Sequence, residues 1–299
     1  MRKNENAAYV PSSVRAVRKK ARVVHLSKET GFHVLVILFG LFMMYPLLWM
    51  LVSSFKEPTQ IFRSGFWPTK WIWDSYVTGW AGISGYPFSL FLRNSFILVG
   101  AVIAGNLISC SLTAYAFAKL QFPLRGFWFA LMLGTLMLPM HVKIIPQYIL
   151  FKQLSWTNTY LPLIVPSFFA TQGFFVFMMT QYMRGLPREM DEAATVDGCG
   201  FFRHYATIIL PLSVPVLITT SIFTFIWTWN DFFSQMLYLS QLNTFTVALA
   251  LRMFVDGMGQ SFWGALFAMS VVSLIPLFVM FIGFQNYLVE GITAGSIKG

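Results

Sequence analysis

Charged residues are scarce in this chain. Asp, Glu, Lys and Arg make up 11% of its 299 residues, against about 25% in ordinary soluble domains. Apolar side chains make up 57%, and a soluble globule of this length cannot cover so much apolar surface with so few charges. Two cysteines are too few for a disulfide scaffold, and the apolar content excludes a disordered chain. The composition therefore predicts a membrane protein.

Motifs for catalysis and for metal binding are also missing. The sequence has no G-x-x-x-x-G-K-[ST] phosphate loop, so any ATP must be bound by another subunit. Neither the four histidines nor the two cysteines (Cys110 and Cys199) are spaced along the sequence as metal ligands are. No Ser or Cys lies in the G-x-S-x-G type of motif that presents a catalytic nucleophile. No carboxylate lies near the centre of an apolar run, where proton-coupled transporters need one. We expect no catalytic residue and no metal site, and an external source of energy.

Six apolar runs are long enough to cross a bilayer, which takes about 20 residues. Strand-type alternation is absent, and the first run is too long and too far from the start to be a signal peptide. We therefore expect an all-α, polytopic membrane protein with six transmembrane helices. The runs are His33–Ser54, Ser95–Ala118, Gly126–Ile145, Tyr160–Thr180, Ala206–Trp229 and Phe262–Phe284.

The distribution of positive charge sets the expected orientation. Residues 1–32 carry eight cations, which places the N-terminus in the cytoplasm by the positive-inside rule. Six spans then return the C-terminus to the cytoplasm. On this topology 14 Lys and Arg residues lie inside and 7 outside. Cations beside a membrane are a topology signal, so the basic N-terminus does not indicate nucleic-acid binding.

The predicted organisation has four parts: a basic cytoplasmic tail (1–32), a first transmembrane helix with an outer loop (33–88), a transmembrane core (89–285) and a cytoplasmic C-terminal tail (286–299). The first outer loop, about Phe55–Asn94, is rich in tryptophan and proline. Its aromatic residues fit an interfacial belt, and a docking surface for an outside partner is the alternative.

Small residues recur at every fourth position of the second run: Ala101, Gly105, Ser109 and Thr113. This spacing makes one smooth helix face and predicts close helix packing. Runs three to six each contain proline, which kinks a helix. Interrupted spans are typical of a bundle that moves.

The cytoplasmic loop of residues 184–211 has the strongest pattern. Pro187 is placed as the first residue of a helix, and the carboxylates that follow it suit the positive helix end. Gly198 predicts a left-handed stop, followed by a second short helix over about Phe201–Leu210. We expect a helix–turn–helix on the membrane face that projects carboxylates. The alternative is an interfacial helix without a partner.

This loop resembles the EAA loop of ABC importer permeases, on which a separate ATPase docks. The residues that match are Glu192, Ala193, Ala194, Asp197, Gly198, Leu210 and Pro211. The C-terminal tail is similar to that of the carbohydrate branch, in which the tail reaches toward the ATPase. It matches at Leu288, Gly291, Thr293, Ala294, Gly295, Lys298 and Gly299. Asn94–Ser95 and the Trp229–Asp231 segment also fit, whereas residues 1–29 lie outside the resemblance.

The resemblance implies a sugar-import permease of the bacterial cytoplasmic (inner) membrane. Its implied partners are a homologous second permease, a dimer of ATPase subunits that binds ATP and Mg, and an extracytoplasmic sugar-binding protein. Closure of the ATPase dimer would push the loop and switch the bundle from inward-facing to outward-facing. The chain itself would bind no cofactor and perform no catalysis.

The substrate is less well defined by the sequence. A translocation path lined by Trp227, Trp229, Asn230, Asp231 and Lys143 is one interpretation, and an aromatic belt with a helix cap is the other. The outside cations exceed the outside carboxylates by three (7 against Glu57, Asp74, Asp231 and Asp256), which favours an acidic oligosaccharide. An importer of another solute such as glycerol phosphate, and more distantly an embedded enzyme or structural bundle, remain alternatives.

Overall fold

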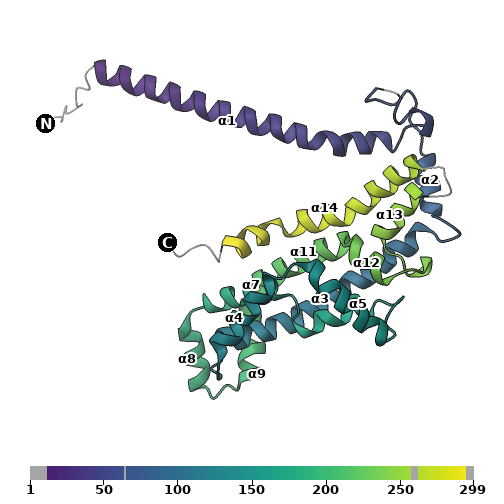
Figure 1. The fold of residues 1–299 in the computed structure, drawn as a ribbon. Helices are drawn as coiled ribbons and strands as arrows, with labels where there is room; N and C mark the ends of the chain where they lie inside the picture. Colours follow the sequence, from purple (N-terminus) through teal and green to yellow (C-terminus); the bar gives the residue numbers. More distant parts are fainter. Residues whose placement is uncertain (1–11, 64, 257–261, 294–299) are drawn as a thin grey trace.

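The computed structural model describes residues 12–63, 65–256 and 262–293. Over these ranges the chain is helical and has no β-strand, apart from one isolated bridge between Ile83 and Tyr86. The predicted all-α class is confirmed. Figure 1 shows a bundle of helices with the first helix, α1, standing beside it.

Helix α1 (Ser12–Ser53) is joined to the bundle near its end. Its apolar part, Thr30–Ser53, is long enough to cross a membrane. Near that end the Trp49 ring meets Phe267 of α14 (Trp263–Thr293), with the ring centroids 5.3 Å apart. The apolar side chains of Phe32–Tyr45 are otherwise exposed, as expected of a helix whose neighbours are lipid or another chain.

The bundle is built around α3 (Phe88–Lys119), which packs against α7 (Gly173–Arg184), α11 (Val214–Asn230) and the 3-10 turn η2 (Val165–Phe169). One core cluster surrounds its first half and includes Phe88, Val99 and Trp229. A second surrounds its other half and includes Cys110, Tyr115 and Met179. Apolar packing on both halves fixes α3 as the axis of the fold.

The stripe of small residues on α3 allows the close approach that its spacing predicts. Ser109 Oγ donates to the Ser167 carbonyl oxygen at 2.6 Å and accepts from the Ala170 amide at 3.1 Å. A Cβ atom on Gly105 would overlap Ser167 Oγ and lie 2.9 Å from the Phe168 ring. Only glycine therefore fits where η2 crosses α3.

The third run is broken, as the proline within it predicts. Gly126–Ile145 folds as two short helices, α4 (Arg125–Leu136) and α5 (Met140–Gln153), with Pro139 as the N-cap of α5. Proline disfavours helical geometry in the residue before it, so the first helix ends ahead of Pro139. Neither piece is long enough to span a membrane alone.

Two other runs are interrupted. The fourth comprises α6 (Leu161–Ile164), η2 and α7, with Ala170 in the left-handed region at φ 52°. The fifth bends by 75° between Phe201–Leu212 and Val214–Asn230. Among the described residues four helices are long and apolar enough to cross a membrane, or five if the bent pair is one span. The cysteines are both free, as expected from their separate positions.

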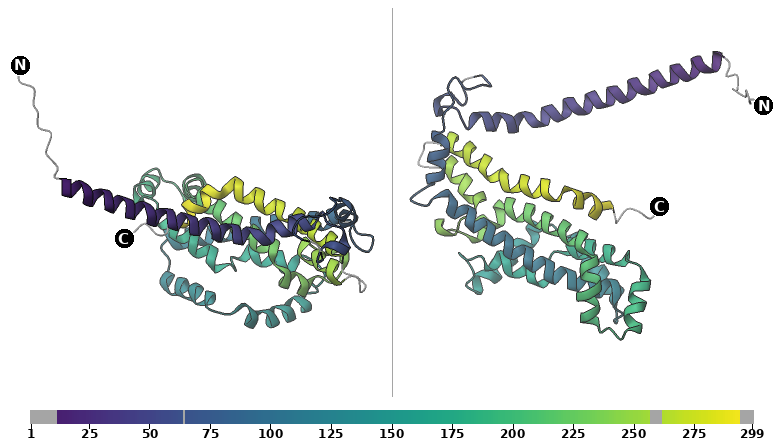
Figure 2. Two further views of the ribbon diagram at one scale, coloured as in Figure 1. Left: turned by 90° about the horizontal axis from the view of Figure 1, so that it is seen from above. Right: turned by 180° about the vertical axis from the view of Figure 1, so that it is seen from behind.

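The remaining elements are short and lie at the two ends of the bundle. They are η1 (Pro58–Gln60), α2 (Asp74–Ala81), α8 (Arg188–Val196), α9 (Phe201–His204), the π-helical turn η3 (Tyr205–Ile209), α10 (Leu210–Leu212), α12 (Phe232–Tyr238), η4 (Leu242–Thr244) and α13 (Val247–Asp256). The start of α1, the end of α14 and the α8–α9 hairpin lie toward one end (Figures 1 and 2), with α2 and α13 toward the other. The loop of residues 184–211, the start of α1 and the end of α14 therefore share one side of the bundle.

The packing of η2 on α3 predicts different results at two glycines of the same helix. Gly105→Ala should lower stability by about 1–3 kcal/mol, because the added methyl overlaps Ser167. Gly100→Ala should leave the melting temperature unchanged or raise it, because nothing lies within 4 Å of the new atom. Thermal unfolding of each variant in detergent, followed by size-exclusion chromatography, measures the difference. Equal melting temperatures would contradict the assigned contact.

Candidate functional site

The loop of residues 184–211 folds as the expected helical hairpin. Pro187 is the N-cap of α8, one residue before its predicted place inside the helix. Gly198 follows the helix at φ 67°, so the predicted left-handed stop is confirmed. The Cys199 amide donates to the Ala194 carbonyl at 2.9 Å, closing the turn. The second arm runs from Phe201 to Leu212 through the π-helical turn, two residues further than predicted.

The hairpin exposes acidic side chains next to apolar ones. Glu192, Ala193, Asp197 and Gly198 are exposed, whereas Ala194 is the one buried residue of α8. Val196 and Phe202, which flank the turn, are 88% and 83% exposed. At the far end of the second arm Leu210 is half-buried and Pro211 is exposed. Exposed apolar side chains beside carboxylates make a surface suited to a protein partner.

An ion pair ties α8 to the end of α3. Lys119 Nζ lies 2.7 Å from Asp191 Oδ2, and the two side chains are 7% and 29% exposed. His204 Nε2 lies 3.2 Å from the other Asp191 oxygen, Oδ1, without hydrogen-bond geometry. Because α8 buries only Ala194, this ion pair is its main polar attachment to the bundle.

The second arm is attached to the same stretch of α3. The Tyr115 hydroxyl lies 3.0 Å from His204 Nδ1 and donates to the Phe201 carbonyl at 3.1 Å. Ser111 and Tyr205 share a hydroxyl–hydroxyl hydrogen bond of 2.7 Å. Both arms of the hairpin therefore contact the last third of α3, so a force on the hairpin reaches that helix directly.

Sequence reasoning missed these contacts. Lys119 and Asp191 are 72 residues apart, and Lys119 is one of several cations expected on the inner side. The two residues line a hollow of about 470 Å³ together with Ala118, Gln121, Arg125, Arg184, Arg188 and Glu192. No spacing rule connects residues of two different loops, so only the fold reveals the pair.

Two adjoining cavities lie on the flank of α3. The first, about 490 Å³, is lined by Val102, Asn106, Gln172, Phe175, Thr224, Ile226, Trp227, Thr228, Asn230 and Asp231. The second, about 370 Å³, shares Val102, Gln172 and Asp231 with it and also contains Lys143, Gln147, Ser234 and Tyr238. Four of the five residues predicted for a translocation path, Trp227, Asn230, Asp231 and Lys143, thus line these cavities. Asn106, Gln172 and Thr224 also do so and were not predicted.

Trp229 is the exception. It is 4% exposed and stacks on Phe225, with the ring centroids 5.3 Å apart and the planes at 11°. Trp229 points into the core because it lies on the opposite side of α11 from Trp227. Its assignment to the path is therefore corrected to core packing.

Asp231 performs the capping role that was the alternative interpretation. Its Oδ1 accepts from the Ser234 amide at 3.0 Å, at the start of α12. Burial, and then the nearby Asp231 carboxylate, raise the pKa of the Tyr238 phenol. Tyr238 therefore remains a protonated hydroxyl at neutral pH in the wall of the second cavity.

The Asn94–Ser95 pair pins the start of α3 to the segment before α13. Asn94 Nδ2 donates to the Asn243 and Phe245 carbonyls, both at 2.9 Å, and Ser95 Oγ accepts from the Val247 amide at 2.9 Å. These contacts are structural, and they fix the end of the bundle opposite the hairpin.

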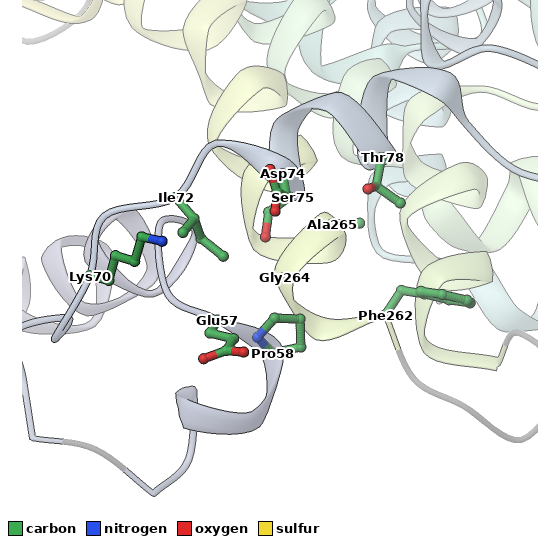
Figure 3. Close-up of a pocket in the computed structure, with 10 residues that line it drawn as sticks. All are labelled: Glu57, Pro58, Lys70, Ile72, Asp74, Ser75, Thr78, Phe262, Gly264 and Ala265. Carbon is green, nitrogen blue, oxygen red and sulfur yellow. The ribbon is translucent and has the colours of Figure 1, made fainter.

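That opposite end carries a fourth hollow, of about 570 Å³ (Figure 3). Figure 3 shows Glu57, Lys70 and Asp74 around it, with Ser75 facing Gly264 at the start of α14. Trp67, Trp71 and Trp73 of the same loop are exposed. In the C-terminal region Thr293 is the last residue of α14, and Ala294, Gly295 and Lys298 lie outside the described residues.

Comparisons with known proteins agree on one family. Residues 105–293 match the profile of the family described as binding-protein-dependent transport system inner membrane component. The chain is 34% identical over 292 residues to the probable ABC transporter permease protein YurM of Bacillus subtilis, covering 97% of this chain and 95% of the relative. It is 33% identical over 263 residues to the trehalose/maltose transport system permease protein MalG of Thermococcus litoralis, covering 88% and 94%.

Two further similarities bear on the range of the family. The sn-glycerol-3-phosphate transport system permease protein UgpE of Yersinia enterocolitica is 31% identical over 266 residues, covering 87% of this chain and 94% of the relative. The fold also resembles a chain of a solved bacterial ABC transporter for import of the acidic polysaccharide alginate. The TM-score is 0.77 at 19% identity, covering 94% of this chain and 99% of that chain.

The hairpin, the bundle and these similarities lead to one conclusion. The chain belongs to the binding-protein-dependent transport system inner membrane components, the permease family of ABC importers: it is an inner-membrane transport subunit and not an enzyme.

Proposed function

We propose that the chain is the permease subunit of an ATP-driven sugar importer. The observation that carries the proposal is the exposed acidic hairpin, whose two arms contact the end of α3 while the flank of α3 lines two cavities. A push on the hairpin would move the wall of those cavities. The named sugar permeases among its relatives support a carbohydrate as the substrate.

The proposed topology has six passes with both termini in the cytoplasm. The broken third run, α4 with α5, and the bent fifth run each count as one pass. The eight cations before residue 33 and the shared position of the hairpin, the start of α1 and the end of α14 support this orientation. The proposed parts are 1–32, 33–88, the permease core 89–285 and 286–299.

The proposed partners follow from the two ends of the bundle. A dimer of ATPase subunits, which binds ATP and Mg, would dock on the exposed residues Glu192, Ala193, Asp197 and Gly198. Buried Ala194 would seat α8 on the bundle, and Leu210 and Pro211 would fix the second arm. The tail at Thr293, Ala294, Gly295 and Lys298 would reach toward the same dimer. A homologous second permease would complete the path, and an extracytoplasmic binding protein would deliver the sugar.

Glycerol phosphate is the second candidate substrate, because UgpE is a relative of comparable identity. An acidic oligosaccharide would be favoured by the excess of outer cations. Lys143 lines the second cavity. Glycerol phosphate or an acidic oligosaccharide would therefore find a positive side chain in that cavity.

Cysteine labelling tests the topology. The native Cys199, beside the hairpin turn, should react with a membrane-impermeant maleimide only from the cytoplasmic side. In a Cys199→Ser background, Thr69→Cys in the exposed outer loop should react in intact cells, without opening of the membrane. Buried Cys110 is the internal control for non-specific access. Reaction of Cys199 in intact cells would reverse the orientation.

Two substitutions test the docking surface. Glu192→Lys should weaken ATPase co-purification, because a charge-assisted hydrogen bond is worth about 1.5–3 kcal/mol. Gly198→Val should do the same through the backbone, because a β-branched residue at φ 67° costs about 1–3 kcal/mol. Glu57→Lys reverses an exposed carboxylate at the other end of the bundle and should leave co-purification unchanged. Wild-type uptake by both hairpin variants would refute docking at this loop.

A double-mutant cycle tests the tie between α8 and α3. Lys119→Ala or Asp191→Ala should each destabilise the hairpin by about 1–3 kcal/mol, because each leaves a partly buried partner unpaired. The double variant should lose less than the sum of the two. The measurement is the rate of proteolytic cleavage within residues 184–211, with exposed Arg188→Ala as the control. Additive effects would show that the pair contributes no coupling.

A further inference from the structure

A buried amide in α3 has an acceptor without a partner. Asn106 is 1% exposed, and its Nδ2 donates to Thr224 Oγ1 at 3.3 Å. Its Oδ1 is buried and accepts no hydrogen bond from the described residues. Buried acceptors are almost always paired, and an unpaired one is unfavourable. The Oδ1 atom of Asn106 therefore needs a hydrogen-bond donor from outside the described residues.

The amide stands in the wall of the first cavity, which holds about 490 Å³. That size falls within the usual range for small-molecule sites. The terminal torsion of asparagine is soft, so the amide turns toward an incoming donor at little cost. Gln172 and Asn230 add two further amides to the same wall, and both are exposed.

An aromatic ring completes the lining. Trp227 is 46% exposed, and one side of its ring stacks on buried Phe175, with centroids 5.1 Å apart and planes at 20°. Phe175 holds the indole in place. A sugar presents both hydroxyl groups and a face of C–H bonds, so a fixed indole beside several amides matches its chemistry.

The charge of the cavity limits the ligand further. Of the described residues that line it, Asp231 is the only acidic one, and none is a lysine or an arginine. A carboxylate or phosphate would stand near the Asp231 carboxylate without compensation. Lys143 lines the neighbouring cavity instead.

We propose that this chain holds a ligand site of its own for a neutral sugar, in which Asn106 accepts a hydrogen bond from a sugar hydroxyl beside the Trp227 ring. The inference rests on the proposed sugar import and deepens it, because it names the residues and the charge class of the substrate. The unpaired Asn106 acceptor is the observation that points to a ligand.

The test uses the whole importer, purified with its second permease and its ATPase and reconstituted in proteoliposomes with the binding protein. Radiolabelled maltose, trehalose, cellobiose and raffinose are the neutral probes, and glucuronate and sn-glycerol 3-phosphate are the anionic probes. The readouts are uptake rate and the amount of probe that stays bound to the detergent-purified complex without binding protein.

Asn106→Leu should lower retention and uptake of the transported neutral sugar about 2- to 12-fold, the effect of one lost hydrogen bond. ATPase co-purification should stay at the wild-type level, which separates this effect from misfolding or failed docking. Thr224→Val removes the acceptor of the Asn106 amide NH2 group and should change retention less than Asn106→Leu does. Thr113→Val is the matched control, because the Thr113 hydroxyl already donates to the Ser109 carbonyl of the same helix at 2.8 Å.

Three outcomes overturn the site. Wild-type retention and uptake by Asn106→Leu would show that the amide contacts no ligand, while sugar import itself still stands. Retention of an anionic probe in preference to every neutral sugar would contradict the charge argument. If the unmodified importer moves none of the neutral probes, the proposed sugar import fails, and the site fails with it.

Discussion

The close packing of α3 against η2, α7 and α11 is the contact on which the rest of the molecule depends. Ser109 satisfies the backbone of the broken fourth run at Ser167 and Ala170. In a low-dielectric surrounding an interrupted helix persists only where neighbouring groups take up the freed hydrogen bonds. The hydroxyl of Ser109 and the missing side chain of Gly105 together allow η2 to lie directly on α3.

Because α3 is held along its length, it joins the two functional regions. Its last third meets both arms of the hairpin, through Lys119 at α8 and Tyr115 at α9. Its middle supplies Val102 and Asn106 to the cavities. Under the proposed docking, a displacement of the hairpin would reach the cavity wall along this helix. The bend of 75° before α11 turns the second arm away from the axis of α11, which packs in the core.

Local patterns that depend on one stretch of chain were predicted well. Gly198 marks the end of α8 because a positive φ is a property of a single residue. The stripe on α3 follows from a four-residue spacing, and the helical hairpin follows from the proline and glycine at its helix ends. Proline predicted an interruption of the third run, but hydropathy counts only apolar side chains, so the structure decided that the run forms two short helices on either side of Pro139. Trp227 and Trp229 look equivalent in the sequence, yet Trp227 lines a cavity and Trp229 packs on Phe225.

The sequence by itself determined the membrane class, the helical fold and the hairpin with its acidic residues. Hydropathy, charge bias and turn formation each depend on residues that are close together in the sequence. The tertiary structure alone decided which carboxylate faces inward and which amide lacks a partner. Asp191 and Glu192 are adjacent, but the helix turns one toward Lys119 and the other outward. In the folded chain α11 brings Thr224 to Nδ2 of Asn106, whereas no donor reaches its Oδ1. Such pairings arise between segments that are far apart along the chain, and no local rule encodes them.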